Sequence, residues 1–155
     1  MTEITEKPEI AVDPMQDLCG YHLRQLSAVS MALLANTLSK YDITPTAASV
    51  LLVIAENPET RQSAVGRHLS IRRANIAPII AALEAGGHLK RVRIDGRSHG
   101  LVCTRTGKAL ASRVRTAFEA HESRLFGSLP KKDRQKLTRL FQQIRLDLLA
   151  QANLE

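Results

Sequence analysis

A short run in the second half of the chain gathers side chains that could bind phosphate. Arg93, Arg97 and His99 flank the dipeptide Asp95-Gly96, with an extended segment on each side. Asp-Gly between two extended segments is a strong signal for a two-residue hairpin turn, because such a turn needs backbone φ above zero. A hairpin tip that carries cations has little to bury and much to offer a phosphate backbone. The run therefore predicts a basic hairpin that contacts DNA.

The positive charge of the chain is concentrated around this hairpin. The formal net charge is +7, and residues 61–108 hold ten lysines and arginines against two acids, Glu84 and Asp95. The rest of the chain is therefore close to neutral. Cations that are gathered in one segment, rather than spread evenly, are the electrostatic signature of a nucleic-acid contact.

The elements expected around the hairpin place it after three short helices. Thr44-Pro45 should begin a helix, since Thr is a good N-cap and Pro fits the first helical position. Gly86-Gly87 should end another. In chain order, helices are expected at residues 15–40, 47–55, 61–69, 73–85, 105–126 and after Pro130, and strands at 89–94 and 100–104. Three short helices followed by a hairpin predict a winged helix-turn-helix.

The predicted fold is mainly α with one small β-hairpin wing. The winged helix-turn-helix would span residues 44–104, after a loose arm at 1–14, and helices at 15–43 and 105–155 would flank it. Both flanking regions have apolar stripes that a lone winged domain could not cover. In the last helix the stripe contains Leu137, Leu140, Phe141, Ile144 and Leu148. A two-fold dimer interface is the natural use of this surface, and it would place two winged domains on successive half-sites of DNA.

Four short motifs, in order and at fitting spacings, resemble those of the MarR-type transcriptional regulators. Residues 83–91 (LEAGGHLKR) are similar to the family's LExxGLxxR, residues 95–97 (DGR) match its wing motif DxR, and residues 104–107 (TRTG) resemble its LTxxG; the Thr44-Pro45 opening also fits. The resemblance extends from about Leu18 to Leu149. It implies a homodimeric DNA-binding repressor, or less often an activator, that a small molecule releases from pseudo-palindromic double-stranded DNA.

The resemblance also implies roles for individual residues. Arg97 would enter the minor groove. Asp95 would hold this arginine, or another basic side chain of the wing, by a charge-assisted hydrogen bond. The recognition helix would be 73–85. The residues expected at the DNA are Arg72, Arg73, Ala74, Asn75, Ala77, Arg93, Asp95, Arg97, Ser98 and His99. Asn75 can make two hydrogen bonds to adenine, and an arginine can read guanine. Alternatively, the arginines touch only phosphates and Asn75 caps a backbone group.

Pro78 lies inside the expected recognition helix, where its missing N–H should loosen the first turns. The pattern ANxxP at residues 74–78 resembles a branch of these regulators that is tied to the catabolism of aromatic acids and phenylpropanoids. The implied effector is an aromatic carboxylate or its coenzyme A thioester. Candidate effector-binding residues are Tyr21, His22, Arg24, Gln25 and Met31 of the first helix. The alternatives are a core histidine at His22, a solvated Arg24 and a packing role for Met31.

Peroxide sensing and DNA binding without sequence preference are two alternatives to ligand-controlled regulation. Cys19 lies near the start of the first helix, where peroxide-sensing relatives carry a reactive cysteine, although Leu23 stands where a partner tyrosine would be expected. The alternative for Cys19 is a small buried thiol, and Cys103 should be structural. A DNA-binding protein without sequence preference is the second function. Its footprints would show no preferred sequence.

Enzymatic function is not expected. The five histidines are scattered, and the sequence has no HExxH, P-loop or GxGxxG pattern, so we expect neither a metal nor another cofactor. No apolar run approaches the roughly 18 residues of a membrane span. No secretory signal is visible, and the two distant cysteines suit a reducing compartment. These features favour a cytoplasmic protein.

Overall fold

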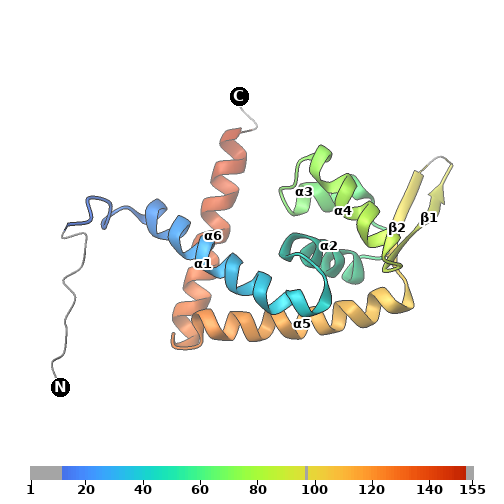
Figure 1. Cartoon of the computed structure of the whole chain (residues 1–155). Coiled ribbons are helices and arrows are strands. Elements are labelled where there is room, and N and C mark those ends of the chain that lie inside the picture. The colour runs from blue at the N-terminus through green and yellow to red at the C-terminus, as the bar shows by residue number, and fades with distance from the viewer. Residues whose placement is uncertain (1–11, 97, 153–155) are drawn as a thin grey trace, which may run out of the picture.

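The computed structural model describes residues 12–96 and 98–152 (Figure 1). Its elements in chain order are α1 (Cys19–Leu38), the 3-10 turn η1 (Ser39–Tyr41), α2 (Pro45–Glu56), α3 (Gln62–His68), α4 (Arg73–Ala85), β1 (Leu89–Asp95), β2 (Ser98–Cys103), α5 (Arg105–Phe126) and α6 (Lys131–Ala152). The expected fold class, mainly α with a hairpin wing, is confirmed. Most of the expected arm at residues 1–14 lies outside the described residues. Within them, no helix has the length and hydrophobicity needed to span a membrane.

Local capping sets the helix ends as the sequence predicts. The Thr44 hydroxyl accepts the Ala47 N–H at 3.2 Å, and Pro45 occupies the first position of α2. Thr104 caps α5 in the same way through the Gly107 N–H, at 3.0 Å. The helix α1 begins at Cys19 rather than at residue 15, because residues 14–17 form a turn in which Asp13 accepts the Met15 N–H.

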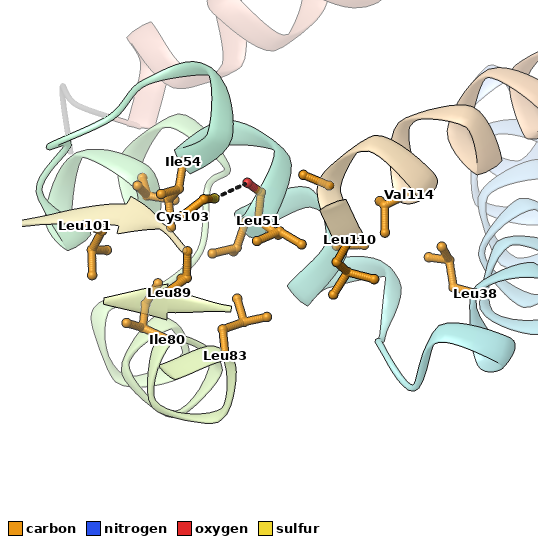
Figure 2. Packing of buried hydrophobic residues seen from close by; sticks show 14 of the residues in the cluster. Leu38, Leu51, Ile54, Ile80, Leu83, Leu89, Leu101, Cys103, Leu110 and Val114 are labelled. Atoms are coloured by element: carbon orange, nitrogen blue, oxygen red, sulfur yellow. Dashed lines mark hydrogen bonds between the residues drawn. The ribbon is translucent and has the colours of Figure 1, made fainter. Parts of the chain in front are cut away.

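The core lies between α2, α4, α5 and the hairpin, as Figure 2 shows. Leu51 and Ile54 of α2, Leu101 of β2 and Val114 of α5 all belong to this buried cluster. Cys103 belongs to the same core, and its thiol lies 3.9 Å from the Leu51 carbonyl oxygen (Figure 2). Burial raises the pKa of the Cys103 thiol, and the nearby Lys108 partly opposes this effect. A protonated, packed side chain fits the structural role expected for Cys103.

The hairpin is antiparallel, with Leu89 opposite Cys103 and Asp95 opposite Ser98. Because Asp95 pairs with Ser98 within the ladder, Asp95 does not belong to the turn, which was expected at Asp95-Gly96. Gly96 has φ +32°, and residue 97 lies outside the described residues. A bulge between Arg93 and Asp95 accounts for the shift in register, because it adds an unpaired residue to β1.

The first and last helices leave apolar side chains uncovered. In α6 every residue from 138 to 151 is exposed, including Ile144 at 53% and Leu148 at 59%. In α1, Leu26 and Val29 are exposed by 42% and 57%. Figure 1 shows the winged domain at the beginning of the long α5 and α6 at its other end. The chain thus exposes apolar side chains on two helices that lie outside the winged domain.

Candidate nucleic-acid interface

Helix α4 presents an open face of the expected composition. Ile76, Ile80 and Leu83 are buried at a helical spacing and hold one side of α4 on the core. The five residues expected at the DNA, Arg72, Arg73, Ala74, Asn75 and Ala77, are all exposed. The backbone N–H of Asn75 donates to the Arg72 carbonyl oxygen at 2.9 Å. Its side-chain amide has no hydrogen bond to the described residues, so the alternative of a backbone cap receives no support. The open N-terminus of α4 also favours a phosphate, because its free N–H groups carry partial positive charge.

A basic groove of about 820 Å³ runs between α3, α4 and β2. None of the described residues that line it is acidic. Its polar lining includes Arg61, Arg67, Arg72, Arg73, Ser63, Ser70, Ser98 and His99. Four arginines from α3, α4 and the residues just before these helices thus line one concave surface, where their potentials add. Arg61 and Arg67 were not among the residues expected at the DNA, although the charge count of residues 61–108 includes both.

The wing residues are held by contacts within the hairpin and with α3. The Arg93 side chain donates from Nε to the Gly96 carbonyl oxygen at 2.9 Å and so closes the turn. Asp95 forms an ion pair with Arg61 at 3.2 Å, and the same guanidinium group lies 3.4 Å from the Ser98 hydroxyl. Arg97, the expected partner of Asp95, lies outside the described residues. The partner that the structure gives Asp95 therefore comes from the start of α3.

Further contacts join the wing to the segment before α3. The backbones of Glu59 and Thr60 each make one 2.9 Å hydrogen bond to Leu101. Arg91 joins Glu84 at 3.0 Å and lies 3.4 Å from the Gln62 side chain. Exposed ion pairs add little stability, so these contacts matter for geometry: they set the position of the wing beside α3 and α4.

The expected effector-binding residues lie on α1, and none of them lines the basic groove. The Gln25 amide donates to the Tyr21 hydroxyl at 2.7 Å, and the Arg24 guanidinium group lies 5.6 Å from the Tyr21 ring centre. His22 is exposed, with Nε2 2.6 Å from the Gln16 carbonyl oxygen, so the interpretation as a core histidine is wrong for the single chain. Met31 is 46% exposed.

Two other kinds of site were considered from the sequence, a reactive cysteine and a metal site. Cys19 is exposed at the first residue of α1, which contradicts the interpretation as a buried thiol. Across the described ranges, no three His, Cys, Asp or Glu side chains are grouped closely enough to hold a metal ion. The open face of α4 lies beside the basic groove and next to a wing held in place by its contacts with α3. This arrangement suits the binding of a DNA duplex.

Comparison with known proteins agrees with this geometry. Residues 41–98 match the model of the MarR family. The chain is similar to the transcriptional repressor CouR bound to a 23-mer DNA duplex, with 29% identity, a TM-score of 0.81, and coverage of 88% of this chain and 99% of that one. No curated protein matches the chain.

Two further solved structures share the fold at lower identity. CouR from Rhodococcus jostii RHA1, bound to p-coumaroyl-CoA, is 19% identical with a TM-score of 0.78, over 86% of this chain and 95% of that one. PcaV from Streptomyces coelicolor, in complex with its natural ligand, is 23% identical with a TM-score of 0.76, over 88% and 97%.

Proposed function

We propose that this chain, of which residues 41–98 match the model of the MarR family, is a homodimeric, sequence-specific repressor of that type, and that a small aromatic carboxylate or its coenzyme A thioester releases it from DNA. The proposed DNA binding rests on the basic groove beside the open face of α4. The proposal gives the chain no catalytic role.

In the proposed complex α4 enters the major groove. Asn75 has the side chain for a two-bond contact with adenine, and Arg72 or Arg73 can read guanine or bind phosphate. Ala74 and Ala77 are small enough to let the helix approach and to meet thymine methyl groups. The wing, with Arg93, Asp95, Arg97, Ser98 and His99, reaches the neighbouring minor groove and its phosphates.

The proposed dimer uses the exposed stripes of α1 and α6. Leu140, Ile144 and Leu148 recur along one side of α6, and Leu26 and Val29 are open on α1. Removal of apolar area from water is favourable by about 25 cal/mol per Å², before the costs of association are subtracted, so these stripes favour association. A two-fold axis through this region would set two α4 helices on a pseudo-palindromic site.

The effector class is supported by the solved relatives. CouR from R. jostii is described with p-coumaroyl-CoA, an aromatic acyl thioester. The polar cluster of Tyr21, Arg24 and Gln25, with His22 beside it, lies on α1 next to the stripe that a second copy would cover. Met31 could supply an adaptable apolar wall. A site on α1 would therefore be completed by the partner subunit.

Selection of duplexes from a random DNA pool with the purified full-length chain tests the regulatory function. A repressor of this kind should enrich a pseudo-palindrome with half-sites roughly one helical turn apart. The selected duplex is then titrated with phenolic acids and their coenzyme A thioesters. Absence of any enriched sequence would favour the DNA-binding protein without sequence preference. Release by peroxide that Cys19→Ser abolishes would favour the thiol-based sensor.

A further inference from the structure

The first half of α6 carries a row of cations along one side. Lys132, Lys136 and Arg139 are spaced by four and three residues, and all three are exposed. Residues at this spacing share one face of an α-helix, so the three side chains form a basic stripe. Residues 131–139 hold five lysines and arginines against one acid, Asp133, so the segment is strongly positive at neutral pH.

The basic stripe has no partner among the described residues. None of its three side chains forms an ion pair or a hydrogen bond with a described residue. Its charges also oppose the helix that carries them, because cations near a helix N-terminus meet the positive end of the helix dipole. Lys132 and Lys136, four residues apart, repel each other. Stabilisation of α6 therefore does not account for these residues.

The basic stripe is far from the surface that α4 and the wing present to DNA. Helix α5 begins at the base of the wing, where the hydroxyl of its cap Thr104 donates to the Gly87 carbonyl oxygen at 2.6 Å. The 22 residues of α5 rise about 1.5 Å each, which gives about 33 Å. Helix α6 begins at the opposite end of α5, as Figure 1 shows. The basic stripe is therefore a separate surface, and no side chain is long enough to join the two.

The composition of the basic stripe suits a phosphate backbone. Leu140, Ile144 and Leu148 lie on another side of α6, and at 100° per residue their centre is about 110° around the helix. A membrane would need this apolar side, which the proposed dimer covers, and a protein partner would need apolar anchors beside the charges. Phosphates need only cations and polar groups. Nucleic acid is therefore the partner that the basic stripe fits best.

We propose that the basic stripe is a second DNA contact, independent of sequence, through which a dimer bound to one duplex holds another duplex segment. The second segment can belong to the same DNA molecule, because neighbouring DNA is at high effective concentration around a bound dimer. Contacts to about three phosphates give a weak interaction that depends strongly on salt. The inference rests on the proposed function for the dimer at its operator, but not for the contact between the stripe and DNA.

The test is the capture of a second duplex by the full-length chain. A duplex with the selected sequence is fixed on beads, saturated with protein and washed, and a fluorescent duplex of unrelated sequence is added at several salt concentrations. The wild type should retain the fluorescent duplex, with a salt slope of about 2.7 from three contacts. The triple variant Lys132→Gln, Lys136→Gln, Arg139→Gln should reduce capture at least tenfold, because glutamine keeps the helix but removes the charge. Its affinity for the fixed duplex should stay within twofold.

A matched control removes three charges from another face of the same helix. Lys131, Arg134 and Arg145 also belong to α6, and at 100° per residue their centre is about 140° from the basic stripe. The variant with glutamine at all three positions has the same net charge as the first triple variant, and it should capture the second duplex within twofold of the wild type. Sedimentation equilibrium and circular dichroism check that both variants are dimeric and folded. If the first triple variant does not fold, Lys136→Gln alone should lower the salt slope by about 0.9.

Each outcome decides the proposal. Equal losses in both triple variants would attribute capture to net charge and overturn the stripe. Capture that survives removal of the stripe would assign the second duplex to the winged domains. A wild type that captures phosphatidylserine vesicles but no duplex would overturn DNA as the partner.

The acidic arm of the chain is tested in the same way. Capture that appears only when Glu3, Glu6 and Glu9 are replaced with glutamine would assign the stripe to this arm and overturn DNA as its partner. If duplex selection finds no preferred sequence, the regulatory function fails, yet capture between two unrelated duplexes still tests the stripe.

Discussion

Replacing Gly100 with alanine should separate the wing from the segment before α3. A Cβ on Gly100 would lie 2.3 Å from the Glu59 carbonyl oxygen and 2.7 Å from Cδ1 of Ile94. Ordinary contacts of carbon need about 3.5 Å, so the backbones must move apart by about 1 Å. The two 2.9 Å hydrogen bonds that join Leu101 to Glu59 and Thr60 lie directly beside this contact. They cannot both survive such a movement.

The size of the effect follows from these two bonds. Each contributes about 0.5–1.5 kcal/mol net, so their loss should lower the free energy of unfolding by about 1–3 kcal/mol. Gly20→Ala is the matched control, because nothing lies within 4 Å of a Cβ there. Gly20 is in α1, where alanine is favoured over glycine by roughly 0.5–1 kcal/mol. The two substitutions should therefore change stability in opposite directions.

The assay is urea unfolding at one fixed protein concentration, followed by fluorescence anisotropy with the selected duplex. Gly100→Ala should unfold at lower urea, bind DNA more weakly, and show a shallower dependence of affinity on salt, since wing contacts to phosphate are lost. An unchanged urea midpoint would refute the close approach of the two backbones. Reduced stability with wild-type affinity and salt dependence would refute the role of the wing.

Four further predictions concern single features of the chain. Arg61→Ala should weaken DNA binding and reduce the salt slope by about 0.9, one phosphate contact; an unchanged slope would remove Arg61 from the interface. Asn75→Ala should relax preference at particular base pairs by about 1–3 kcal/mol, whereas a uniform loss across sequences would assign Asn75 to the backbone. Truncation before Leu137 should give monomers in sedimentation equilibrium, and surviving dimers would contradict the α6 interface. Because burial raises the pKa of the Cys103 thiol, the thiol stabilises the fold below its ordinary pKa of 9.0, and this contribution should disappear as the pH rises further. In thermal unfolding, Cys103→Ser should therefore lose less stability than the wild type above that pH. Equal losses in the two proteins would refute the raised pKa of Cys103.

The helices were predictable because their signals are local. Thr44 and Thr104 act on N–H groups three residues away, and the bounds of α4 follow from an apolar repeat that ends at Gly86-Gly87. The hairpin turn was misplaced by one residue for a related reason. Asp95-Gly96 is a genuine turn signal, but the bulge after Arg93 shifts the register and carries Asp95 into the ladder.

The sequence by itself determined the order of the helices, the basic hairpin, the open face of α4 and the apolar stripes of α1 and α6, because capping and periodicity depend on residues within a few positions of one another. Only the tertiary structure decided which distant groups meet. It paired Asp95 with Arg61 and joined four arginines into one groove. These contacts depend on how α2, α4, α5 and the hairpin pack around Leu51 and Leu101, and such packing has no periodic signal in the chain.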